Sequence, residues 1–93
     1  MSSNSNTWYV YMVQCSDGTL YTGITNDLEK RITAHNSGKD GARYTRGRRP
    51  VKLVYAEKTG SRSTAASKEH RIKRLKRNGK MRLAEDQYIM PPT

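Results

Sequence analysis

The chain has 93 residues and a formal net charge of +10, from 18 lysines and arginines against 8 aspartates and glutamates. This length suits one small domain, and with only 33% hydrophobic residues its core must be thin. The sequence has no apolar run long enough to span a membrane. It has a single cysteine, which excludes a zinc site built on cysteines. The excess of positive charge indicates a polyanionic partner, and we expect nucleic acid, with DNA favoured, rather than a membrane.

The ends of the chain differ from its middle in composition. Residues 1–6 are polar and uncharged, so we predict a disordered lead-in without a signal peptide. We expect one domain over residues 7–86 and a tail over residues 87–93, which contain Pro91 and Pro92. With one cysteine and no signal peptide, the expected location is the reducing cytoplasm.

Two strands are predicted first, over Trp8–Gln14 and Thr19–Thr25, and the turn "CSDGT" lies between them. A two-residue turn would place Tyr11 and Tyr21 on opposite faces of the sheet. A three-residue turn, with Gly18 in the left-handed region, would place both hydroxyls on one face. Both turns are common, and the sequence alone leaves the choice open.

A helix is predicted next, with Asn26 as its N-cap, Glu29 three residues later and a stop at Gly38. Its inward stripe combines two apolar and two polar residues: Leu28, Arg31, Ile32 and His35. Polar residues at positions that usually belong to a core tend to mark a functional site.

The remaining elements complete a mixed fold. A basic loop over Lys39–Pro50 precedes a strand over Val51–Ala56. A basic helix is predicted over Thr64–Asn78, ending at Gly79, and a short helix over Met81–Asp86. The order predicts an α+β fold, with a small antiparallel sheet of three strands flanked by two or three helices.

Six residues could carry chemistry: Tyr11, Tyr21, Arg31, His35, Tyr44 and Glu69. Each has an ordinary structural explanation, such as the helical ion pair between Glu69 and Lys73. Together they suit phosphodiester cleavage, which needs a cation beside the transition-state oxygens, a metal ligand and a proton acceptor. Arg31 and Glu69 would supply the first two. A tyrosine or His35 would supply the third, although a phenol with a pKa near ~10 is a poor base unless a cation lowers that value.

These residues lie in a familiar order, and the sequence resembles the GIY-YIG endonuclease superfamily, in particular its small stand-alone type. The tripeptide "YVY" ends at Tyr11, and "YTG" begins at Tyr21, ten positions later. The similarity continues through "LEKRITAHNSG", "GARYTRGRRPVKLVY" and "AASKEHRIKRLKR", over roughly residues 7–83. The first motif lacks Gly-Ile, and His35 stands where many superfamily nucleases have tyrosine. The stand-alone proteins share these variants, which leave the choice of base open.

The resemblance implies site roles. Glu69 would hold one divalent metal, Mg²⁺ or Mn²⁺, mostly through water. Tyr21 would be the base or would orient the attacking water, assisted by Tyr11 and His35, and Arg31 would steady the scissile phosphate. The residues expected to contact nucleic acid are Tyr44, Arg46, Arg48, Arg49, Lys73 and Lys76.

Three functions compete at this point. The first is a metal-dependent endonuclease for branched, flap or single-stranded DNA, with a place in DNA repair or recombination. The second is a non-catalytic nucleic-acid-binding module on the same fold. The third is a nuclease subunit that is active only with a larger protein partner. Neither the oligomeric state nor a role for Cys15 follows from the sequence.

Overall fold

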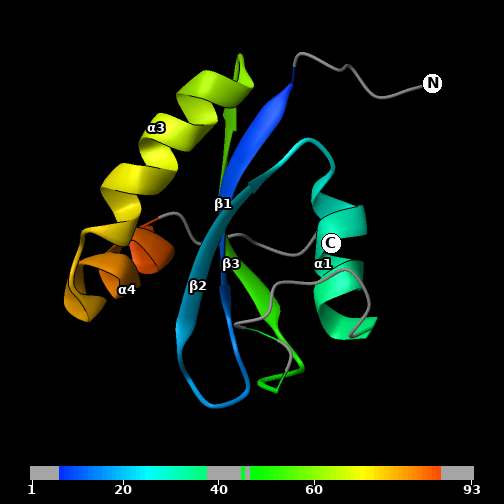
Figure 1. The fold of residues 1–93 in the computed structure, drawn as a ribbon. Helices are drawn as coiled ribbons and strands as arrows, with labels where there is room; N and C mark the ends of the chain where they lie inside the picture. The colour runs from blue at the N-terminus through cyan, green and yellow to red at the C-terminus, as the bar shows by residue number, and fades with distance from the viewer. Residues whose placement is uncertain (1–6, 38–44, 46, 87–93) are drawn as a thin grey trace.

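A computed structural model describes residues 7–37, 45 and 47–86. Three antiparallel strands form one sheet in the order β2-β1-β3, and three helices flank it (Figure 1). The α+β fold expected from the sequence is therefore confirmed. The elements are β1 (Trp8–Gln14), β2 (Leu20–Thr25), α1 (Leu28–Ser37), β3 (Lys52–Thr59), α3 (Arg62–Lys73) and α4 (Arg77–Asp86). None of the helices in these described ranges has the length and apolar character needed to cross a bilayer.

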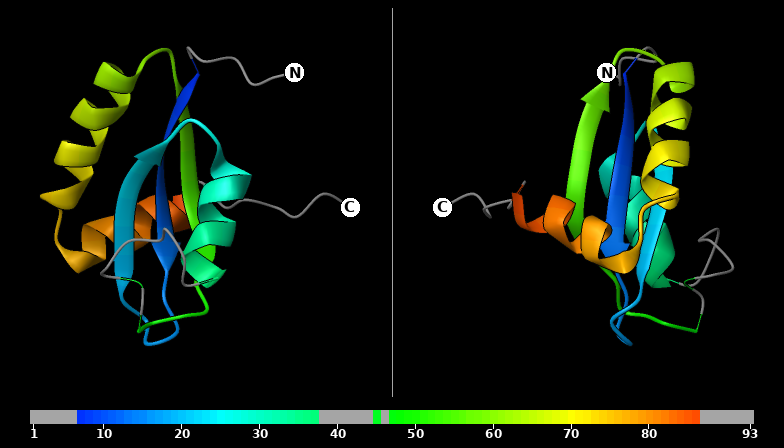
Figure 2. Two further views of the ribbon diagram at one scale, coloured as in Figure 1. Left: turned by 45° about the vertical axis from the view of Figure 1, so that its right-hand side comes forward. Right: turned by 90° about the vertical axis from the view of Figure 1, so that its left-hand side faces the viewer.

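The helices lie on both faces of the sheet, with α1 on one side and α3 and α4 on the other (Figures 1 and 2). β1 is the central strand, and its four middle residues, Val10 to Val13, are completely buried. Side chains alternate along a strand. As a result, Tyr11 and Val13 face α1, whereas Val10 and Met12 face α3 and α4.

Each face has its own hydrophobic cluster. The cluster under α3 and α4 consists of Val10, Met12, Leu20, Tyr55 and Ile72, with partly buried residues of α4 packed against it. The cluster under α1 consists of Tyr11, Val13, Cys15 and Val51, bordered by Leu28 and Ile32 of α1. The inward stripe predicted for α1 is thus confirmed, and Cys15 is a buried free thiol in the second cluster.

The β1–β2 turn has three residues. Cys15 donates its N–H to the Thr19 carbonyl at 2.8 Å, and Gly18 has a φ of 88°, in the left-handed region that favours glycine. The register pairs Tyr11 with Gly23 and therefore places Tyr11 and Tyr21 on the same face. The three-residue alternative is confirmed.

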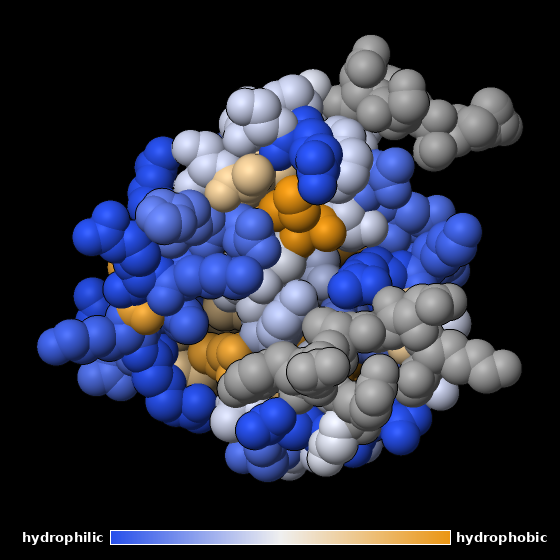
Figure 3. All heavy atoms as spheres, in the orientation of Figure 1, coloured by the Kyte–Doolittle hydropathy of each residue, from blue (hydrophilic) through white to orange (hydrophobic). Residues whose placement is uncertain are grey.

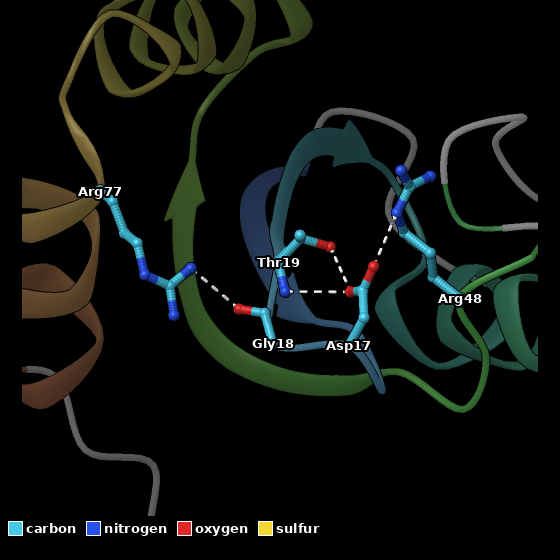
Figure 4. Close-up of polar contacts among 5 residues, drawn as sticks. All are labelled: Asp17, Gly18, Thr19, Arg48 and Arg77. Carbon is cyan, nitrogen blue, oxygen red and sulfur yellow. Dashed lines mark hydrogen bonds and ion pairs between the residues drawn. The ribbon is translucent and has the colours of Figure 1, made fainter.

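Two arginines hold this turn from opposite sides (Figure 4). The Asp17 carboxylate accepts hydrogen bonds from Thr19 within the turn and from Arg48 Nε at 3.0 Å. Arg77, at the start of α4, donates to the Gly18 carbonyl at 2.9 Å. The hairpin end is therefore tied both to the segment before β3 and to the last helix.

The start of α1 differs from the prediction by one residue. Asp27, not Asn26, is the capping residue, because its Oδ1 accepts the backbone N–H of Lys30 at 3.1 Å. The Thr25 hydroxyl accepts the Asp27 N–H at 3.1 Å and fixes the chain between strand and helix. Asn26 is exposed in this connection.

The predicted boundary between the last two helices is wrong. α3 ends at Lys73 instead of Asn78, with Arg74 as its C-cap, and Gly79 lies inside α4 rather than ending a helix. Gly79 packs closely on Leu75, since a Cβ atom added there would lie 3.3 Å from the Leu75 Cβ. Gly79 is thus part of a close local contact between residues four positions apart, and it does not end a helix. β3 also runs beyond Ala56 to Thr59, because its end pairs with Trp8 of β1.

Candidate active site

Tyr11 is the centre of the polar network between the sheet and α1. Its side chain is completely buried, and its hydroxyl lies 2.9 Å from His35 Nε2 and 3.3 Å from Arg31 Nε. A Cβ atom at Gly23, the cross-strand partner of Tyr11, would lie 2.7 Å from this hydroxyl. Glycine at position 23 therefore makes room for the Tyr11 ring to cross β2 and reach α1.

Tyr11, Tyr21 and His35 form a cluster of three rings. The ring centroids lie 6.4 Å apart for the two tyrosines, 6.0 Å for Tyr11 and His35, and 5.4 Å for Tyr21 and His35, the last pair edge-on. These separations are typical of aromatic pairs. Four of the predicted site residues, Arg31 included, are thus brought together from β1, β2 and α1.

His35 is 1% exposed, and its Nδ1 lies 2.8 Å from the Thr45 hydroxyl. Burial, and then the Arg31 charge, lower the pKa of His35 to about 4, so the ring is neutral at pH 7. A neutral imidazole has one donor and one acceptor nitrogen.

The hydrogen bonds fix which nitrogen of His35 carries the proton. Arg31 can only donate, so among the described residues the acceptor for the Tyr11 O–H is His35 Nε2. His35 Nδ1–H then donates to the Thr45 hydroxyl. Thr45, which is completely buried, thereby orients the whole chain of contacts. No pattern in the sequence indicates this role, because Thr45 lies ten residues from His35 in a basic segment.

The charges at Tyr11 and Arg31 are well defined. Burial raises the pKa of Tyr11, and the hydrogen bond and charge of Arg31 offset this only in part. Burial also opposes the charge on Arg31, but the contacts with Tyr11, followed by those with Tyr21, outweigh it and raise the Arg31 pKa. Tyr11 is therefore a neutral phenol and Arg31 a cation.

Glu69 belongs to α3, which lies on the other side of the sheet from α1 (Figure 1). Its carboxylate accepts from Lys73 Nζ at 3.1 Å, and its side chain is 22% exposed. Its charge is among the causes that raise the Tyr11 pKa, so it lies within electrostatic reach of the tyrosine hydroxyl. No hydrogen bond between described residues joins Glu69 to Tyr11.

The donor groups available for a metal are few. In the described part of the chain, no three His, Cys, Asp or Glu side chains converge on one point. A single carboxylate that leaves most ligand positions to water suits Mg²⁺, which keeps several waters when bound. Glu69 fits such a metal, although its ion pair with Lys73 competes for the same carboxylate.

Arg31 can be reached from solvent. It lines a cleft of about 300 Å³ together with Trp8 and Arg62, and a second hollow of about 270 Å³ together with Asp27 and Lys30. A phosphate group could therefore approach the guanidinium beside the ring cluster.

The predicted nucleic-acid contacts are spread over the molecule. Arg48 pairs with Asp17, and Arg49 Nη1 reaches the Asn36 carbonyl at 3.5 Å. Lys73 pairs with Glu69, and Lys76 is exposed. Tyr44 and Arg46 lie outside the described residues, as do the predicted lead-in and tail.

Comparison with known proteins identifies the domain. Residues 7–83 match the family model described as the GIY-YIG catalytic domain, a nuclease-type fold whose enzymes generally use a divalent metal. A UPF0213 protein of Desulfotalea psychrophila is 62% identical over 68 residues, which cover 73% of this chain and 62% of that relative. A UPF0213 protein of Clostridium perfringens is 56% identical over 81 residues, covering 87% and 86%.

A solved structure agrees with this assignment. The solution NMR structure of a UPF0213 protein from Bacillus halodurans has a TM-score of 0.57 and 41% sequence identity, covering 88% of this chain and 86% of that one. The matched region contains the residues of the polar network and Glu69. The chain therefore belongs to the GIY-YIG family, among the UPF0213 proteins.

Proposed function

We propose that this protein is a metal-dependent endonuclease that hydrolyses phosphodiester bonds in DNA. The observation that carries the proposal is the convergence of Arg31, Tyr11, Tyr21 and His35 on one face of the sheet, beside an open cleft. The net charge of +10 provides the attraction for a phosphate backbone.

Arg31 binds the scissile phosphate in this proposal. A guanidinium has five N–H donors in a rigid plane and holds its charge at any physiological pH. Because Arg31 Nε donates to Tyr11, the plane of the guanidinium is fixed before substrate arrives. A cation oriented in advance stabilises the charge that develops on the phosphate oxygens in the transition state.

Tyr21 orients the attacking water and, as a phenolate that has released its own proton to solvent, accepts the proton of that water. Its ring is only partly buried, whereas Tyr11 is completely buried and its hydroxyl is engaged by two partners. Tyr11, His35 and Thr45 form a hydrogen-bonded chain, and this chain holds Arg31 and the aromatic rings in position. This division of roles follows from burial, since Tyr11 is completely buried and Tyr21 is partly exposed.

Glu69 holds the divalent metal, with Mg²⁺ favoured and Mn²⁺ as the substitute. The bound ion would neutralise charge on the phosphate and on the leaving oxygen. Lys73 lies beside this carboxylate, and its ammonium group would be available to a neighbouring phosphate.

Cleavage of branched, single-stranded and duplex DNA with Mg²⁺ or Mn²⁺ tests the proposal. Glu69→Gln should lower the cleavage rate by at least about 100-fold, because it removes the charge that holds the metal. Glu85→Gln removes the same charge from an exposed position of α4 and should leave the rate unchanged. Failure of the wild-type chain to cleave any substrate, or equal rates for the two variants, would overturn it.

A non-catalytic nucleic-acid-binding module is the second candidate. The ion pair between Glu69 and Lys73, and the absence of a cluster of metal ligands among the described residues, favour it. In that case DNA binding would fall steeply with salt, Glu69→Gln would bind as well as the wild type, and no cleavage would occur. If cleavage appeared only after addition of a copurifying acidic protein, the chain would be a partner-dependent subunit.

A further inference from the structure

A cleft of about 300 Å³ extends from Arg31 to the beginning of α3. It is bordered by the first residue of β1, the connection between β2 and α1, and the first residue of α3. Its lining residues are Trp8, Ile24, Thr25, Asn26, Arg31 and Arg62. No acidic side chain is among them, although the cleft adjoins the candidate active site through Arg31.

Two guanidinium groups face this cleft. Arg31 is fixed by its hydrogen bond to Tyr11. The guanidinium of Arg62 lies over the Trp8 ring, 5.6 Å from its centroid, in a cation–π contact that orients it. Arg62 has no ion pair with any residue that the structure describes. Two guanidinium groups that line one hollow, with no acidic side chain among its lining residues, form a site for an anion, and a phosphate group suits the planar donors of arginine.

The cleft also has an apolar part. Trp8 and Ile24 are among its lining residues. Figure 3 shows small apolar areas set among hydrophilic side chains on one face of the molecule. An aromatic ring beside phosphate-binding arginines is the combination with which proteins bind single-stranded nucleic acids, because every base has a face that can stack. A volume of about 300 Å³ is at the lower end for ligand pockets.

We propose that this cleft binds one unpaired nucleotide next to the scissile phosphate. Its phosphate lies between Arg31 and Arg62, and its base lies against Trp8 and Ile24. A base inside a duplex is covered on both faces by its neighbours, so only an unpaired nucleotide can make the second contact. This inference rests on the proposed nuclease function and deepens it, since it makes single-stranded or branched DNA the substrate class.

Binding measured without metal tests the cleft separately from catalysis. The full chain, in the presence of EDTA, is titrated with a short labelled oligothymidylate and with a blunt-ended duplex of similar length, and affinity is followed by anisotropy at several salt concentrations. Trp8 is the only tryptophan, so its fluorescence reports contact at the cleft directly. The oligothymidylate should quench this fluorescence, and the duplex should leave it unchanged.

Three variants and one control complete the test. Arg62→Gln should weaken oligothymidylate binding about tenfold and lower the slope of log K against log salt by about 0.7, the value for one phosphate contact on a single strand. Trp8→Leu should weaken it by a similar factor, and Trp8→Phe, which keeps an aromatic face, should bind like the wild type. Arg74→Gln removes the same charge at the other end of α3, about 18 Å away, and should have a much smaller effect.

The outcomes separate the two proposals. Equal losses for Arg62→Gln and Arg74→Gln, or Trp8 fluorescence that does not respond to the oligothymidylate, would overturn the nucleotide site even if the protein cleaves DNA. Conversely, a wild-type chain that shows the predicted binding but never cleaves would retain the nucleotide site and lose the nuclease function.

Discussion

The two faces of the sheet contrast sharply, although the same central strand supplies both. Facing α3 and α4, Val10 and Met12 pack into an apolar cluster. Facing α1, Tyr11 enters a buried polar network in which its hydroxyl and both nitrogens of His35 have partners. The alternation of side chains along β1 thus separates an apolar face from a face with a buried polar network.

Hydrogen bonding makes the contrast sharper. A buried polar group without a partner destabilises a protein by about 1–3 kcal/mol. The polar groups beside α1 avoid this, because Tyr11, His35 and Thr45 satisfy one another. Among the described side chains, the buried atom that has no partner is Thr22 Oγ1. Thr22 pairs with Met12 in the sheet, so this hydroxyl belongs to the face of α3 and α4.

Met12→Ala should give the largest effect on stability. The side chain is completely buried in the apolar cluster, so its truncation should lower the free energy of unfolding by about 2–5 kcal/mol. Urea denaturation measures this loss. The cleavage rate per folded molecule should stay the same, and a large fall in that rate would break the separation between the two faces.

His35→Gln tests the buried network through pH. The folded His35 has a pKa of about 4, below the value of 6.5 for the unfolded chain. As the pH falls below 6.5, the unfolded chain binds the proton first, so stability declines until about pH 4, by up to ~3 kcal/mol from a difference of 2.5 pKa units. The free energy of unfolding, measured by denaturation between pH 7 and pH 4.5, should show this decline in the wild type. In His35→Gln most of the decline should be absent.

The second histidine provides the control for this experiment. His70 is exposed on α3, so His70→Gln should keep the decline of the wild type. If both variants behave alike, the pH dependence does not come from the network.

Gly23→Ala inserts a methyl group where Tyr11 crosses β2. The new Cβ would lie 2.7 Å from the tyrosine hydroxyl, so the ring must move, at a loss of about 1–3 kcal/mol in stability. Because Arg31 and His35 are both bonded to that hydroxyl, the cleavage rate should fall as well. Gly60→Ala, where no atom lies within 4 Å, is the matched control and should change neither stability nor rate.

Thr22→Val should give the smallest change, and in the opposite direction. The substitution replaces the unpartnered hydroxyl with a methyl group of similar size and should raise the free energy of unfolding by about 1 kcal/mol. Activity should not change. A loss of stability would mean that the Thr22 hydroxyl is satisfied in solution and that this face also depends on buried polar contacts.

Much of the fold follows from local patterns. The strands, the stripe on α1 and the flanking helices could be predicted because hydrophobic periodicity is a local property. Whether Tyr11 and Tyr21 lie on the same face of the sheet depended on the length of one turn. The sequence could not decide this length, because both turn lengths accept Asp17 and Gly18. The left-handed conformation of Gly18 settled it. The helix boundary near Gly79 was missed because glycine is typical of a helix end, whereas Gly79 lies inside α4.

The candidate site was only partly predictable. Resemblance to known motifs placed Tyr11, Tyr21, Arg31 and His35, and the register brings them together. Thr45 could not be found, because its contact with His35 joins two residues that no local sequence pattern relates. The role of Arg62 was equally hidden, since its position over Trp8 joins residues that are 54 positions apart.

Comparison of two tyrosine variants tests the central claim most directly. Tyr21→Phe removes a hydroxyl from the face of α1, and Tyr55→Phe removes one from the opposite face, where it donates to Glu57 at 2.8 Å. Rates of Mg²⁺-dependent cleavage of branched DNA should fall at least about 100-fold for Tyr21→Phe, because it removes a proton acceptor, and stay near the wild type for Tyr55→Phe. Equal rates for the two variants would contradict an active site on the face of α1.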